Sequence, residues 1–303
     1  MSKHHKKTKV RRRKARKHKG GAKTKKLRCS PNPTNKNDFT CYDNEDLYRL
    51  RDLWNIRHPD AQIESNEVHV IWDKLNKEMK NVCNKESCWL KQNFVKKKDR
   101  SKLIDSFAPV APSVWKKKPH DWLSSTEIID VMRQYEKAYK CFEFIGPSPI
   151  DYDTRKLYGQ CIWQELCKLN LKQQLDRGKK KIGIIFNLDP HYLPGSHWVS
   201  MFINIKKGQI YYFDSAGAPI PDQLMKLVNE VKKQGKGLGI DFKFDQNHPV
   251  EHQYGNTECG VYALYFIVHM LEDKITKEYL KTHILKDEYI HKFRKVYFNE
   301  DKL

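Results

Sequence analysis

A compact β-hairpin near the middle of the chain places the strongest constraint on the fold. Two apolar segments, residues 197–205 and 209–213, flank the short sequence Lys206-Lys-Gly208. This pattern predicts two antiparallel strands joined by a tight turn. Because the segments on the two sides of the turn have similar lengths, the residue that begins the first strand and the residue that follows the second should lie at the same end of the ladder. These residues are His197 and Asp214.

The chain around this hairpin alternates between strand and helix patterns. Further strands are predicted at 181–188 and 242–244, and helices at 160–175, 221–233, 259–271, 276–285 and 287–298. Residues 43–105 have apolar side chains at helical spacing, and the capping sequence Ser124-Ser-Thr-Glu127 predicts another helix. The sequence therefore predicts an α+β fold with three parts: a disordered basic tail and linker (1–38), a helical N-terminal module (39–112) and a C-terminal domain (113–303).

Cys259 opens the strongly apolar helix predicted for 259–271. A free thiol is mostly protonated at neutral pH, so a nucleophilic cysteine needs groups that favour the thiolate. The N-terminus of a helix favours negative charge, and an imidazolium on His197 would form an ion pair with the thiolate. Asp214 can then accept from the second imidazole nitrogen and fix the tautomer. The three residues predict a thiol nucleophile with an oriented base, as in a cysteine protease.

Gln253 lies six residues before Cys259 and supplies a further part of this chemistry. A tetrahedral intermediate needs hydrogen-bond donors for its oxyanion. The backbone N–H of Cys259 is one such donor, and the side-chain amide of Gln253 is a second. Each residue taken alone has an ordinary structural explanation, such as a buried thiol or a packed histidine. Their order and local contexts together favour catalysis.

Four motifs in this part of the chain resemble the ubiquitin-like-protein-specific (SUMO) proteases and the adenain-type viral processing proteases. The resemblance covers roughly residues 115–275 and is carried by Trp122-Leu123 before a helix, Asn187 ahead of Ser196-His197-Trp198, Phe213-Asp214-Ser215, and Gln253 with Asn256-Thr-Glu-Cys-Gly260. It implies a papain-like cysteine protease core, with a central mixed sheet flanked by helices. Two positions depart from the pattern: Ser125 and Glu258 stand where cellular members often have Asp.

The resemblance also implies the roles of the site residues. In this family pattern Cys259 would be the nucleophile and His197 the general base and acid. Asp214 would be the orienting acid, and Gln253 the oxyanion donor. Trp122 and Trp198 would narrow the substrate channel so that only Gly-Gly fits before the scissile bond. A basic tail and a helical N-terminal extension look like those of the processing proteases of large cytoplasmic DNA viruses, which cut structural polyproteins after Gly-Gly during particle maturation.

The net charge of +21 is concentrated at the N-terminus. Residues 1–28 contain fifteen Lys or Arg and no acidic residue, whereas the other 275 residues have 43 basic and 37 acidic residues, a net charge of +6. A basic segment with few apolar residues is expected to be disordered and to contact polyanions, so nucleic acid is an expected partner of residues 3–28. This segment includes Gly21 and Ala22, a Gly-Gly-Ala site for self-cleavage, although chance composition also explains it.

Neither a metal ion nor an organic cofactor is expected. No glycine-rich phosphate loop is present, and Cys83 and Cys88 lack the second ligand pair of a zinc site. The eight cysteines are too scattered to predict a disulfide framework, so a reducing compartment is expected, with Cys161 and Cys167 packed in a core. No stretch approaches the roughly 18 apolar residues of a membrane span, and the N-terminus has no secretory signal pattern.

The leading functional prediction is a cysteine endopeptidase that cleaves protein substrates after Gly-Gly, with maturation of a viral structural polyprotein as its purpose. An isopeptidase that removes SUMO or ubiquitin is the first alternative. A non-enzymatic, nucleic-acid-associated virion protein and an acyltransferase with the same His-acid-Cys set are the others. The expected location is the virion or the host cytoplasm for a viral protein, and the cytoplasm or nucleus otherwise.

Overall fold

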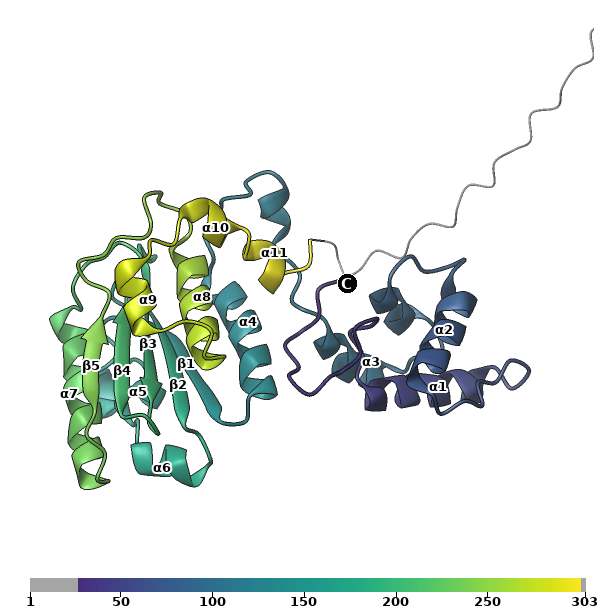
Figure 1. Ribbon diagram of the computed structural model, residues 1–303, viewed down its shortest axis with the longest axis horizontal. Helices are drawn as coiled ribbons and strands as arrows, with labels where there is room; N and C mark the ends of the chain where they lie inside the picture. The colour runs from purple at the N-terminus through teal and green to yellow at the C-terminus, as the bar shows by residue number, and fades with distance from the viewer. Residues whose placement is uncertain (1–26, 301–303) are drawn as a thin grey trace, which may run out of the picture.

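The computed structural model describes residues 27–300 of the chain. These residues form two lobes, a small helical one and a larger one built on a β-sheet (Figure 1). The helices of the small lobe are α1 (Asn44–Arg57), α2 (Val68–Met79), η1 (Glu86–Lys91), α3 (Lys97–Leu103) and η2 (Ile104–Ser106). Their apolar faces bury one common cluster that includes Leu50, Trp54, Ile71 and Trp89. The helical character predicted for 43–105 is confirmed.

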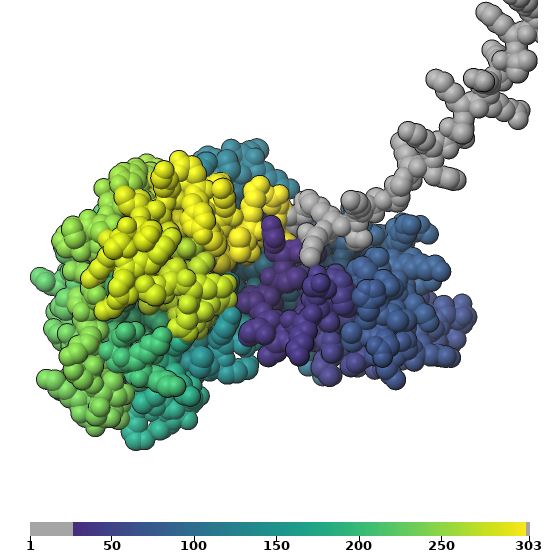
Figure 2. Space-filling model, viewed as in Figure 1, coloured from purple at the N-terminus to yellow at the C-terminus, as the bar shows by residue number. Residues whose placement is uncertain are grey.

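The lobes meet where the N-terminal described residues and the C-terminal segment lie together, the purple and yellow regions of the space-filling view (Figure 2). Asn299 is buried there and joins three segments. Its side chain accepts from the N–H of Arg28 and donates to the carbonyls of Arg28 and Ala108. Its backbone bonds to Pro109 and Ala111. This network makes the predicted boundary near residue 112 a packed joint.

The predicted disorder of residues 1–38 does not extend to residues 27–38. Leu27 is buried in the core of the small lobe, and the backbone of Cys29 pairs with that of Phe107 in an isolated antiparallel β-bridge. An apolar side chain and backbone pairing anchor this segment, which composition alone did not reveal. The remaining part of the tail lies outside the described residues.

The large lobe contains a mixed five-stranded sheet with the order β1-β2-β3-β4-β5. The strands are β1 (Phe142–Pro149), β2 (Lys181–Asn187), β3 (Trp198–Asn204), β4 (Gln209–Phe213) and β5 (Lys243–Gln246). Strands β2, β3 and β4 pair antiparallel, whereas β1 and β5 run parallel to their neighbours. The predicted hairpin is confirmed, because Ile203 faces Ile210 and Ser200 faces Phe213 across β3 and β4.

Helices cover both faces of this sheet. They are η3 (Ser113–Lys116), α4 (Ser125–Ala138), η4 (Leu157–Gly159), α5 (Gln164–Cys167), α6 (Leu171–Asp176), α7 (Asp222–Gly237), α8 (Cys259–Leu271), α9 (Lys277–Thr282), α10 (Asp287–His291) and α11 (Arg294–Tyr297). Side chains alternate along β3, so that Phe202 packs with α4 and α8 while Met201 packs with α7. Among residues 27–300, no helix is long and apolar enough to cross a membrane.

Helix α8 lies against the sheet and is almost entirely buried, as an apolar segment of this length predicts (Figure 1). Helix α4 begins with the predicted capping box, in which Ser124 and Glu127 satisfy backbone N–H groups reciprocally. It packs beside β1 and α8. These two helices carry the ends that face the candidate site.

Elements of the large lobe, and the pairing of cysteines in both lobes, differ from the sequence predictions. Strand β1 was not predicted, because its Gly and two Pro residues are typical of loops. The helix predicted for 160–175 is two short helices, with a new N-cap at Asn170. Six of the eight cysteines are paired, as Cys29–Cys41, Cys83–Cys88 and Cys161–Cys167. The prediction that the cysteines are too scattered for disulfides is therefore wrong, because the partners in each pair are only 12, 5 and 6 residues apart. The free cysteines are Cys141 and Cys259.

Candidate active site

His197 and Asp214 lie together at one edge of the sheet. His197 immediately precedes β3, and Asp214 immediately follows β4. The antiparallel ladder between these strands places the two residues at the same end, as predicted. Nε2 of His197 is 2.6 Å from Oδ1 of Asp214. The carboxylate therefore fixes the ring, and Nδ1 remains for another partner.

Asp214 is held in turn by Asn247, a residue that the sequence analysis missed. Both are buried, with exposed fractions of 1% and 0%. The Asn247 side chain accepts from the N–H of Asp214 at 2.9 Å and donates to its carbonyl at 2.7 Å. The carboxylate also accepts from the N–H of Ala216. Because β4 and β5 are parallel, the residues that follow them share an edge, and this was the signal available for Asn247.

Cys259 is the first residue of α8, and its exposed fraction is 2%. Its thiol lies close enough to the His197 imidazole to raise the pKa of the ring, so the three predicted residues lie together. Burial lowers the pKa of the His197 imidazole, but the hydrogen bonds and charges of Asp214 and Cys259 raise it more, to about 10. An imidazolium is thus favoured between a carboxylate and a sulfur.

Gln253 lies on the loop before α8 and is held at both ends of its amide. Its carbonyl oxygen accepts from the hydroxyl of Ser215 at 2.8 Å, and its Nε2 donates to the carbonyl of Gly255 at 2.9 Å. The backbone N–H of Gln253 also donates to the carbonyl of Ser215. An amide nitrogen has two N–H bonds, so one donor remains for a ligand.

The two predicted substrate-binding tryptophans line one groove with a volume of about 580 Å³. Trp198 is buried and its indole N–H donates to the carbonyl of Leu123, whereas Trp122 is 44% exposed. Gly260 lies against this wall: a Cβ added there would be 2.9 Å from Cβ of Leu123 and 3.2 Å from Cδ1 of Trp198. A side chain at position 260 would therefore crowd Leu123 and Trp198, two residues that line the groove.

Asn187 shapes the loop that enters β3. Its side-chain oxygen accepts from the N–H of Asp189 and of Ser196. Gly195 has a φ of +99°, and a Cβ there would be 2.5 Å from Nδ2 of Asn187. The backbone before His197 is thus fixed by an amide packed against a glycine. The loop also contributes Leu193 and Pro194 to the groove.

The family model described as the Ulp1 protease family, C-terminal catalytic domain, matches residues 132–303. The chain belongs to the Ulp1 protease family. It is therefore a cysteine-type (thiol) protease with the mixed-sheet α+β fold predicted from its sequence.

Viral proteins are among its relatives in this family. A protein of Acanthamoeba polyphaga mimivirus, named as a candidate thiol protease, is 30% identical over 295 residues, which cover 89% of this chain and 92% of the relative. A cysteine protease of African swine fever virus is 27% identical over 227 residues, which cover 70% and 81% of the two chains. A crystal structure of the African swine fever virus protease superposes with a TM-score of 0.59 at 19% identity, and covers 89% of this chain and 95% of that one.

The coverage of this crystal structure extends beyond the region that the family model matches. A shared fold over 89% of the chain includes most of the N-terminal lobe as well as the protease lobe. The family resemblance in the sequence covers roughly residues 115–275 and therefore does not include this lobe. The apolar periodicity of the lobe predicts helices but does not indicate a family. The predicted self-cleavage site at Gly21 and Ala22 lies outside the described residues.

Proposed function

We propose that this chain is an endopeptidase that cleaves protein substrates after Gly-Gly, with Cys259 as its nucleophile. The observation that supports this most directly is the chain of contacts from Cys259 through His197 to Asp214. A cysteine in contact with an imidazole that is itself oriented by a carboxylate is the arrangement that activates a thiol.

The reaction would proceed in two halves. The Cys259 sulfur attacks the carbonyl carbon, and the carbonyl oxygen becomes an oxyanion stabilised by the N–H of Cys259 and the free N–H of Gln253. His197 donates its proton to the leaving amine as the peptide C–N bond breaks. His197 then accepts a proton from water, which attacks the thioester and releases the carboxylate product and the thiol.

The groove beside the nucleophile supports a substrate with small residues before the scissile bond. Leu123 and Trp198 line this groove and also pack tightly against Gly260, the residue after Cys259, so the groove runs close to the proposed nucleophile. Trp122 lines the exposed part of the same groove. Two glycines have no side chains to collide with such a wall, which favours Gly-Gly at the positions before the cleaved bond.

The viral relatives favour processing of a structural polyprotein, in a virion or in the cytoplasm of an infected cell. The basic residues 3–28 would concentrate the enzyme on nucleic acid, with an affinity that falls steeply as salt rises. Cleavage after Gly21 would release residues 1–21 and with them most of the basic side chains of this segment. The family match also favours a second candidate function, the removal of a ubiquitin-like modifier from a conjugate.

The experiment is hydrolysis of a fluorogenic Gly-Gly-X peptide by the wild type, Cys259→Ala and Cys141→Ala. We expect turnover by the wild type, none by Cys259→Ala, and wild-type turnover by Cys141→Ala, which removes the other free thiol away from the site. Equal turnover by Cys259→Ala would exclude this nucleophile. A folded ubiquitin-like conjugate cleaved faster than the peptide would favour the second candidate function.

A further inference from the structure

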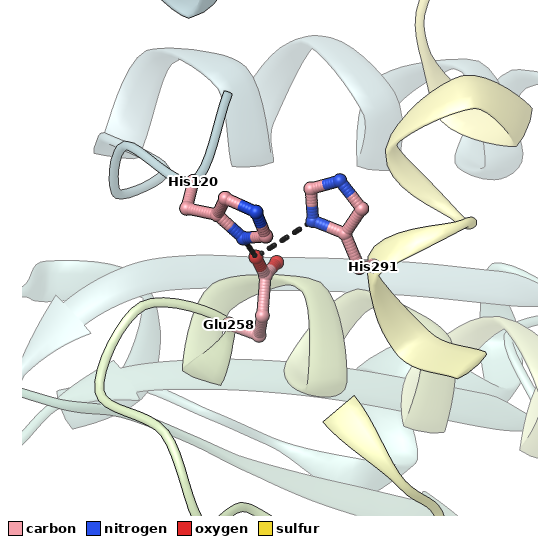
Figure 3. Close-up of side chains that lie close together, drawn as sticks. All are labelled: His120, Glu258 and His291. Atoms are coloured by element: carbon pink, nitrogen blue, oxygen red, sulfur yellow. Dashed lines mark hydrogen bonds and ion pairs between the residues drawn. The ribbon is translucent and has the colours of Figure 1, made fainter. Parts of the chain in front are cut away.

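Three side chains outside the catalytic set converge on one another, and one of them belongs to the residue before Cys259 (Figure 3). They are His120 from the segment before Trp122, Glu258 from the residue before Cys259, and His291 from the end of α10. One atom of each, an imidazole nitrogen or a carboxylate oxygen, lies within 4.8 Å of the others. Segments separated by 138 and 33 residues thus present two nitrogens and one oxygen to a common point.

The two rings present the same nitrogen to the same oxygen. Nδ1 of His120 is 3.2 Å from Oε1 of Glu258, and Nδ1 of His291 is 2.9 Å from it. In tetrahedral zinc sites with bonds of about 2.0 Å, neighbouring ligand atoms are about 3.3 Å apart. The two nitrogen–oxygen distances are thus close to this spacing, and all three ligand atoms lie within 4.8 Å of one another. The two rings are inclined at 27°, with centroids 4.2 Å apart.

The carboxylate is positioned for such a role by Arg294. Its Nε donates to Oε2 of Glu258 at 2.8 Å, so Oε1 alone faces the two rings. Glu258 and Arg294 are both 4% exposed at their side chains, whereas the His120 side chain is 61% exposed. The site therefore has a fixed buried ligand and an open side by which an ion can enter. Outer hydrogen bonds of this kind orient ligands in metal sites.

We propose that His120, Glu258 and His291 bind a Zn²⁺ ion, with water as the fourth ligand. Nitrogen and carboxylate ligands favour zinc over magnesium or calcium, which prefer oxygen. Each neutral ring would carry its proton on Nε2 and direct the Nδ1 lone pair at the ion. The ion would tie the residue before Cys259 to α10 and to the segment that leads into Trp122. Metal binding would thereby stabilise one wall of the substrate groove.

The test is titration of the full chain carrying Cys259→Ser with Co²⁺, a spectroscopic substitute for Zn²⁺. The Cys259→Ser change removes the catalytic thiol as a competing ligand, so the result does not depend on protease activity. We expect visible absorption bands of tetrahedral Co²⁺ that saturate at one equivalent and disappear when Zn²⁺ is added. Mg²⁺ should leave them unchanged.

His120→Ala added to this variant should weaken Co²⁺ binding by about 100-fold or more, since even outer partners of a ligand contribute about 10–100-fold. Because His120 is largely exposed, this variant should keep its fold, which circular dichroism will check. His69→Ala, at an exposed histidine on α2, is the matched control and should bind like the parent. No cobalt bands in the parent, or equal binding after His120→Ala, would overturn the proposal. The two histidines would then serve only as hydrogen-bond donors to Glu258.

Discussion

The two sides of the active site are held in place by different means. On one side, β3 and β4 align His197 and Asp214 through a regular backbone ladder. On the other side, Gln253 and Cys259 lie on a loop and at the start of a helix, and side chains hold them: Ser215 contacts Gln253, while Arg294 contacts Glu258. The proposed base, His197, is thus positioned by secondary structure, whereas the proposed oxyanion donor, Gln253, is positioned by individual hydrogen bonds.

The largest loss of activity is expected when Asp214, on the side of the site held by β3 and β4, loses its negative charge. Asp214→Asn keeps the shape of the side chain but presents the wrong hydrogen-bonding group to His197, and in the Ser-His-Asp proteases the same change lowers kcat by about 10⁴-fold. We expect a loss of this order here, measured as kcat on the Gly-Gly-X peptide. Asp241→Asn, at an exposed carboxylate, is the control and should keep wild-type turnover. A loss below about tenfold would show that Asp214 does not orient the base.

The same variant predicts a change in pH dependence. Among the groups that raise the pKa of His197, the hydrogen bond to Asp214 comes first, and together they bring this pKa to about 10. As pH rises through this value the imidazolium loses the proton needed by the leaving amine, so kcat/KM should fall above about pH 10. In Asp214→Asn the fall should begin at lower pH. If the fall in kcat/KM at high pH were unchanged in Asp214→Asn, the group that titrates there would not be His197.

A smaller loss of kcat is expected from a change at Gln253, on the side of the site that side-chain hydrogen bonds hold in place. Gln253→Ala removes the proposed oxyanion donor, and loss of one such donor typically lowers kcat by about 10²–10³-fold. KM should change little, because the donor acts on the developing charge. Ser215→Ala is the matched variant: it removes the clamp on the Gln253 oxygen but leaves the N–H donor in place. Equal losses in the two variants would indicate that Gln253 has only a structural role.

The sequence predicted the side of the site held by the hairpin better than the side held by side-chain hydrogen bonds. The hairpin predicted the pairing of His197 with Asp214, because strand lengths on either side of a short turn determine which residues meet. The contacts of Gln253 and the packing of Gly260 against Leu123 and Trp198 depend on segments distant in sequence, and no local pattern reports them. Strand β1 escaped prediction for another reason: it is an edge strand, where Pro is tolerated.

Asn247 supports Asp214, on the side of the site held by β3 and β4, through side-chain hydrogen bonds. Asn247→Ala would leave the N–H and the carbonyl of Asp214 without their buried partner, at a cost of about 1–3 kcal/mol for a buried unsatisfied group. We expect a loss of stability of this size in urea denaturation, and a fall in kcat smaller than that of Gln253→Ala. Asn204→Ala, at a buried residue near the other end of β3, is the control. It should lose stability but keep its kcat. If Asn247→Ala also kept its kcat, the ladder alone would suffice to place Asp214 against His197.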